Sequence, residues 1–93
     1  MKEFDWNPVK NQELMEERGV SFEDVVFFVM NDGLLDDIQH PSTANYPGQR
    51  MLIVCIDDYA YLVPYVESDE TIFLKTIIPS RKATKRYLGA SNE

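Results

Sequence analysis

The side chains best suited to chemistry in this 93-residue chain are gathered toward its end. Residues 75 to 92 contain no acid, and their cations are Lys75, Arg81, Lys82, Lys85 and Arg86. Guanidinium and ammonium groups bind phosphate and carboxylate oxygens, and arginine does so with paired donors. The segment therefore predicts a site for an anion.

Four of these cations fall in a helix predicted over 81–88, where they break two rules of local stability. Arg81 and Lys82 stand in the first turn, where the helix dipole disfavours a cation by roughly 0.3–1 kcal/mol. Arg81 with Lys85, and Lys82 with Arg86, are like charges one turn apart, which costs roughly 0.2–0.5 kcal/mol per pair. We therefore expect this helix to hold an anion, with help from uncapped backbone N–H groups in its first turn. The alternative is a solvated basic face without a specific ligand.

Other residues could complete such a site. His40 heads a polar loop, and an imidazole with a pKa of about 6.5 suits general acid or base work, although a loop histidine can also be inert. Tyr46 and Tyr87 could stack on bases, and Tyr87 accompanies the basic cluster. Arg50 and Lys75 lie near the ends of predicted strands, where they are either ordinary edge charges or the floor of an anion site.

The formal charge of −7 argues against indiscriminate nucleic-acid binding, because an acidic surface repels backbone phosphates. The charge is unevenly distributed. Residues 1–37 hold ten acidic side chains against Lys2, Lys10 and Arg18. The acid-rich first helix is then either a solvated face or a docking surface for a basic partner.

Several function classes are disfavoured by composition. The single Cys55 lies in an apolar run, so we expect a small core residue and no internal disulfide. One histidine, one cysteine and scattered carboxylates predict neither a metal site nor a cofactor. No stretch approaches the roughly 20 apolar residues of a membrane span, and the first residues lack a secretory pattern, so we expect a cytoplasmic protein.

Hydrophobic periodicity and turn residues predict the order of elements. In sequence they are a short edge strand at 4–6, helices at 8–18 and 22–30, strands at 34–39, 50–56, 59–66 and 71–78, and a helix at 81–88. Short connections make neighbouring strands antiparallel, and Pro64 predicts a bulge or an edge position. The expected fold is one α+β domain over 1–93, with two N-terminal helices packed on an antiparallel sheet of about four strands and a short C-terminal helix.

Three phrases of the sequence resemble a known family. They are FDWNPVK at 4–10, ERGVSFED at 17–24 and IIPSRKATKRY at 77–87. In this order and spacing they are similar to the BrnT family, the toxins of bacterial type II toxin–antitoxin pairs. The resemblance covers nearly the whole chain and implies a RelE-like fold and an endoribonuclease that inhibits translation. It also implies a cognate antitoxin with a ribbon-helix-helix DNA-binding end, so that DNA is bound only through the complex.

The resemblance implies roles for the candidate residues. It places Arg81 and Lys82 in the basic motif of the closing segment, Arg50 at the start of a central strand and His40 in the loop after the first long strand. The predicted reaction is metal-free attack of a ribose 2′-OH on the adjacent phosphate. The predicted catalytic residues are His40, Arg50, Arg81 and Arg86, and the predicted RNA-binding residues are Tyr46, Lys75, Lys82, Lys85 and Tyr87.

A second function remains open at this point. The chain could be a non-catalytic interaction domain, or a degenerate toxin, that binds a partner protein through its acidic helices and its basic C-terminal helix. The charge of −7 favours protein docking over RNA capture.

Overall fold

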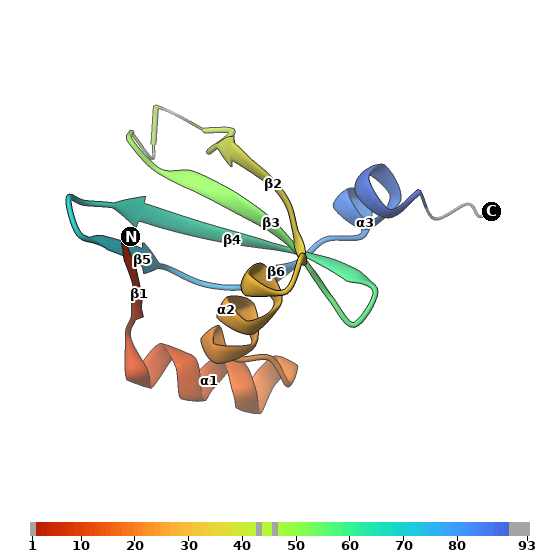
Figure 1. The fold of residues 1–93 in the computed structure, drawn as a ribbon, viewed down its shortest axis with the longest axis horizontal. Helices are drawn as coiled ribbons and strands as arrows, with labels where there is room; N and C mark the ends of the chain where they lie inside the picture. Colours follow the sequence, from red (N-terminus) through yellow and green to blue (C-terminus); the bar gives the residue numbers. More distant parts are fainter. Residues whose placement is uncertain (1, 43, 46, 90–93) are drawn as a thin grey trace.

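The computed structural model describes residues 2–42, 44–45 and 47–89, and within them the chain forms three helices and one mixed β-sheet (Figure 1). The elements are β1 Glu3–Trp6, α1 Pro8–Arg18, α2 Phe22–Met30, β2 Leu34–Gln39, β3 Arg50–Ile56, β4 Tyr59–Glu67, β5 Thr71–Leu74, β6 Ile78–Pro79 and α3 Arg81–Leu88. The α+β class is confirmed. No helix in the described residues is long and apolar enough to cross a membrane.

Local signals set the ends of α1. The Asn7 side chain accepts hydrogen bonds from the backbone N–H groups of Val9 and Lys10, at 2.8 and 3.1 Å. Pro8 occupies the first helical position, where its missing N–H removes no helix bond. Gly19 ends the helix with a φ of 71°, a conformation that glycine adopts without a steric penalty.

The ends of α2 also follow from local sequence. Ser21 and Asp24 form a capping box, with the Ser21 hydroxyl accepting the Asp24 N–H and the Asp24 carboxylate accepting the Ser21 N–H. After the helix the chain turns sharply at Gly33. A Cβ at this position would lie 2.6 Å from the Phe28 carbonyl oxygen and 3.0 Å from that of Cys55, so only glycine fits.

The sheet differs from the predicted antiparallel sheet of about four strands. Its order is β1-β5-β4-β3-β2, with β6 paired to β4 beyond this path. The pairs β2–β3, β3–β4, β4–β5 and β4–β6 are antiparallel, whereas β1 runs parallel to β5. The opening segment therefore is an edge strand, as expected, but it makes the sheet mixed.

The strand predicted over 71–78 is divided into β5 and β6, and this division explains why β4 tolerates a proline at position 64. Within the described residues, no bulge interrupts the register of β4 against β3, and β4 is an interior strand, but on its other side neither β5 nor β6 pairs with Pro64, so the expected edge position is met only locally. The Pro64 carbonyl accepts the Lys75 N–H at 2.8 Å, just after β5 ends. Its missing N–H thus faces the interval between β5 and β6, where ladder pairing is interrupted.

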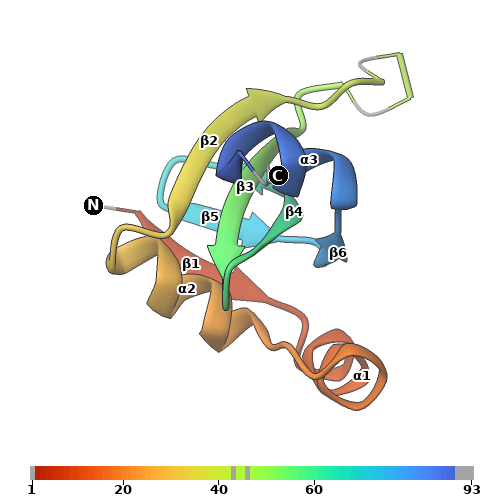
Figure 2. The same ribbon diagram turned by 90° about the vertical axis from the view of Figure 1, so that its right-hand side faces the viewer.

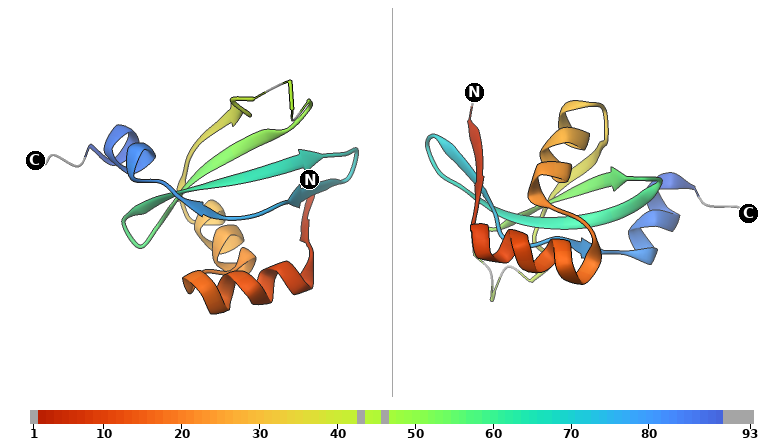
Figure 3. Two further views of the ribbon diagram at one scale, coloured as in Figure 1. Left: turned by 180° about the vertical axis from the view of Figure 1, so that it is seen from behind. Right: turned by 90° about the horizontal axis from the view of Figure 1, so that it is seen from below.

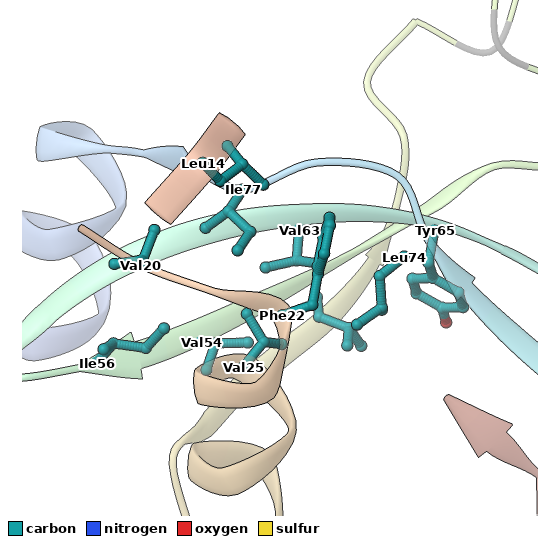
Figure 4. Packing of buried hydrophobic residues seen from close by; sticks show 11 residues of the cluster. Leu14, Val20, Phe22, Val25, Val54, Ile56, Val63, Tyr65, Leu74 and Ile77 are labelled. Atoms are coloured by element: carbon teal, nitrogen blue, oxygen red, sulfur yellow. The ribbon is translucent and has the colours of Figure 1, made fainter. Parts of the chain in front are cut away.

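The main core lies between the sheet and the helices α1 and α2, which cover one face (Figure 3). Phe22 and Val25 of α2 are fully buried and point toward strand residues that include Val54 and Val63 (Figure 4). The Trp6 ring stacks on Phe22 with centroids 5.7 Å apart. Strand β4 contributes Tyr65 and Tyr61 to this core.

A smaller core lies on the other face of the sheet, where α3 packs on β4 and its neighbours (Figure 2). Its buried residues are Ile53, Ala60 and Ala83. Successive side chains of a strand point to opposite faces, so Ile53 faces α3 while Val54 faces α2. The two faces of the sheet are thus covered by different helices.

Candidate functional site

The closing helix α3 is capped at its start and held against the sheet by a hydrogen bond and by apolar packing. The Ser80 hydroxyl caps its start by accepting the Ala83 N–H at 3.0 Å, so this one N–H of the first turn is not available to a ligand. Thr84 Oγ1 accepts the Ala60 N–H of β4 at 2.9 Å. Ala83 itself is buried, and Tyr87 packs on the same small core. These contacts hold the basic helix in one position over the sheet.

A pocket of about 240 Å³ lies between α3 and the sheet. Two cations one turn apart on α3, Lys82 and Arg86, take part in its lining together with Tyr87. The other lining residues are mostly apolar and come largely from β2, β3 and β4: Ile38, Pro41, Met51, Ile53, Leu62, Ser80 and Ala83. The pocket therefore combines a mainly apolar wall with two cationic side chains that are themselves exposed to solvent.

Tyr87 is oriented by an acid of the edge strand β2. Its hydroxyl donates to Asp36 Oδ2 at 2.8 Å, and the Arg86 guanidinium lies 5.7 Å from the centre of its ring. The hydrogen bond from Tyr87 lowers the pKa of Asp36 below its usual value of 3.8, with help from the Asp37 N–H and the charge of Arg86. The same bond raises the pKa of Tyr87. At neutral pH the phenol thus keeps its proton and Asp36 stays ionised.

The four cations of α3 separate into two pairs. Lys82 and Arg86 line the pocket, whereas Arg81 and Lys85 are exposed and, in the described part of the chain, stand outside its lining. The sequence pairs the same residues as like charges one turn apart, and the structure assigns only one of these pairs to the pocket.

Arg50 lies on the opposite face of the sheet. Its Nε donates to Asp37 Oδ1 at 3.1 Å, and its cross-strand partner Tyr65 donates a hydroxyl hydrogen bond to the same carboxylate at 2.8 Å. Tyr65 belongs to the core beneath α1 and α2, so this cluster faces away from α3. Burial, and then the bond to Asp37, raise the pKa of Tyr65 to about 12. The hydrogen bonds with Tyr65 and Asp37 raise the pKa of Arg50. Arg50 thus forms an ion pair with Asp37 on the face of the sheet that lies away from the pocket.

Among the described residues, Lys75 and His40 do not line the pocket under α3. Lys75 follows β5, with Nζ 5.6 Å from the centre of the Phe73 ring. His40 Nδ1 accepts the Ser42 N–H at 3.1 Å, so the neutral ring carries its proton on Nε2. His40 directly precedes Pro41 of the pocket lining. Tyr46 lies outside the described residues.

Two acids that matter here were missed at the sequence level. Asp36 and Asp37 stand side by side in β2, and a register shift between Leu34 and Asp36 precedes them. Asp36 accepts a hydrogen bond from Tyr87 on the α3 face of the sheet, while Asp37 accepts one from Arg50 on the other face. Aspartate is depleted in strands, so two in succession inside a predicted strand were a usable signal.

The rest of the described surface adds no predicted site residue to this picture. A larger hollow of about 650 Å³ is lined by Lys2, Glu3, Asp69, Glu70 and Thr71, far along the sheet from α3. Within the described residues there is no group of three or more His, Cys, Asp or Glu side chains that could hold a metal ion. In comparisons with protein-family models, curated proteins and solved structures, none matches this chain.

Proposed function

We propose that this protein is the toxin of a bacterial type II toxin–antitoxin pair, a RelE-like relative of the BrnT family that cleaves RNA and so inhibits translation. The observation that carries the proposal is the pocket under α3, where Lys82 and Arg86 stand beside Tyr87 over an apolar wall. Cations that bind phosphate next to an aromatic ring and an apolar surface are what single-stranded RNA recognition uses.

Two features of the fold support the RelE-like assignment. Helices α1 and α2 cover one face of a sheet, and a short basic helix follows the last strand on the other face. Both agree with the order of elements that the BrnT resemblance implies. The partner expected with this assignment is an antitoxin with a ribbon-helix-helix end, and DNA is then bound through the complex alone.

The reaction is metal-free transesterification. The ribose 2′-oxygen loses its proton and attacks the adjacent phosphorus, the bond from phosphorus to the 5′-oxygen breaks as that oxygen takes up a proton, and a 2′,3′-cyclic phosphate and a 5′-hydroxyl result. Lys82 and Arg86 hold the phosphate oxygens as negative charge develops on them. Arg81 and Lys85 raise the local concentration of RNA from the outer side of the helix.

His40 is the candidate for proton transfer, with a restriction set by its hydrogen bond. To accept the 2′-OH proton at Nε2, the ring must carry its own proton on Nδ1. That tautomer loses the bond from the Ser42 N–H. A catalytic role for His40 therefore requires a local rearrangement of the 40–42 segment when RNA binds.

Expression in a bacterium tests the function directly. The wild type should arrest growth and protein synthesis and leave cut cellular RNA, while Lys82→Ala/Arg86→Ala should not. Lys2→Ala/Lys10→Ala removes the same charge at the other end of the chain and serves as the matched control. Equal effects of both double variants would indicate a general charge effect, and no effect of the folded wild type would contradict the proposal.

A non-catalytic interaction domain is the second candidate, and exposed apolar side chains favour it. Met30 of α2 is 63% exposed and Phe27 is 60% exposed. Met30 also lines a groove of about 410 Å³, together with Phe4, Trp6 and Val26. Apolar side chains in such positions mark protein contacts, and the acids of α1 suit a basic partner. A toxin also requires a surface for protein contact, because its antitoxin must bind to it.

A further inference from the structure

We propose that the pocket under α3 binds one nucleobase, with the phosphate of the same nucleotide held by Lys82 and Arg86. The inference rests on the proposed function only in taking RNA as the natural ligand. It assigns to the pocket a task distinct from bond cleavage, namely seating a base by its ring face.

The size of the pocket suits a single ring system. Its volume is about 240 Å³, below the roughly 300–1,000 Å³ of pockets for drug-sized molecules. Ile53, Leu62 and Ala83 supply apolar walls from two strands and the helix. A flat ring that unstacks from a single strand gains by leaving water for such a surface.

The charges beside this pocket fit an anion attached to that ring. Lys82 and Arg86 are one turn apart on α3 and both line the pocket, so a phosphate at its mouth lies within reach of two cations. Asp36 is the acid on the facing strand, and its carboxylate accepts the hydrogen bond from Tyr87. The two cations outnumber this one carboxylate, so the local charge favours an anionic ligand. A neutral apolar ligand would gain nothing from them.

Recognition by ring face predicts tolerance of base identity. The polar atoms in the lining are largely occupied, since Ser80 Oγ accepts the Ala83 N–H and the Tyr87 hydroxyl donates to Asp36. Few donors and acceptors remain to read the edge of a base. The four common bases should therefore bind with similar affinity, as on other stacking surfaces.

Titrations of the ¹⁵N-labelled protein, followed by NMR, test the inference. The probes are the four nucleoside 5′-monophosphates, ribose 5-phosphate and inorganic phosphate. The nucleotides should bind about 5- to 150-fold more tightly than ribose 5-phosphate, the factor that one stacked base contributes. They should shift the backbone amides of Ile53, Leu62 and Ala83.

Variants separate the two halves of the pocket. Lys82→Ala/Arg86→Ala should weaken every phosphate-bearing probe, whereas Lys2→Ala/Lys10→Ala should leave their affinities close to those of the wild type. Ile38→Trp should fill the pocket and abolish the advantage of nucleotides over ribose 5-phosphate. The wild-type comparison of those two probes needs no variant, so the inference stays testable if Ile38→Trp does not fold.

The outcomes distinguish this inference from the proposed function. A preference for nucleotides with shifts in the pocket supports the inference, even if the protein cuts no RNA and the ribonuclease proposal fails. Equal binding of ribose 5-phosphate and nucleotides overturns the inference, even if RNA is cleaved. Shifts confined to Arg81 and Lys85 overturn it as well, because they would show anion binding on the outer side of the helix.

Discussion

The hydroxyl of Tyr87 in α3 donates to the carboxylate of Asp36 in β2 over 2.8 Å, and thereby joins the last helix to an edge strand 51 positions earlier in the chain. This bond fixes the ring beside the pocket and keeps an ionised acid within range of Arg86. The bond therefore adds to the contacts of Thr84 and Ala83 with the sheet, which hold the rest of α3 in place.

Tyr87→Phe should raise the pKa of Asp36 toward its usual 3.8, because the largest cause that lowers it is lost. A lowered pKa adds stability above the usual value and loses it as pH falls through the folded-state value. The wild type should thus exceed Tyr87→Phe in free energy of unfolding at neutral pH, and the gap should close in acid. Carboxyl ¹³C titration and denaturation at several pH values measure both effects. An unchanged Asp36 titration would rule out the bond.

Asp36→Asn should bind nucleotides more tightly than the wild type. The change removes a negative charge facing Arg86 and leaves an amide oxygen to accept from Tyr87. An exposed charge pair of this kind corresponds to about a two- to fivefold change in affinity. The same titrations measure it, and the gain should shrink as salt is added. A loss of affinity would mean that Asp36 positions the site more than it opposes the anion.

Tyr65→Phe should change how stability depends on alkaline pH. The phenol of Tyr65 has a pKa raised to about 12, above the usual 10.0, mainly by burial. Its contribution to stability is therefore complete below pH 10 and is lost as pH rises from there through about 12. The difference in unfolding free energy between wild type and Tyr65→Phe should fall over this range. Parallel curves for the two proteins would show that Tyr65 ionises as freely in the fold as outside it.

Gly33→Ala should destabilise the fold. The added Cβ would meet the Phe28 carbonyl oxygen at 2.6 Å and the Phe28 Cβ at 2.9 Å, between the end of α2 and the start of β2. Relief requires a backbone shift, and overpacking of this kind costs typically about 1–3 kcal/mol. Chemical denaturation measures the loss. Stability equal to that of the wild type would mean that the α2–β2 turn can widen.

The parts of the fold that sequence could predict are those that depend on neighbours along the chain. The Asn7 and Ser21 caps, the end at Gly19 and the β3–β4 hairpin all follow from local chemistry. The parallel pairing of β1 with β5 did not, because it joins segments nearly 70 residues apart. The division between β5 and β6 was also missed, since an apolar run does not reveal where ladder pairing stops.

The site was predicted in the same partial way. Residue types marked α3 as the cationic element, and Lys82, Arg86 and Tyr87 do meet at one pocket. Which side of the helix faces that pocket depends on how α3 seats on the sheet through Thr84, a nonlocal contact. Arg50 was grouped with α3 by its charge and by the BrnT resemblance, whereas strand parity and its partner Asp37 place it on the other face.

Cleavage of a defined single-stranded RNA by the purified protein tests the central claim most directly. The wild type should produce fragments with 2′,3′-cyclic phosphate ends, in EDTA as well as in its absence. Lys82→Ala/Arg86→Ala should lose about 10²–10³-fold in rate, the usual effect of removing preorganised charge stabilisation, while Lys2→Ala/Lys10→Ala should match the wild type. Intact RNA after incubation with the folded wild type, or cleavage that survives loss of Lys82 and Arg86, would contradict the account.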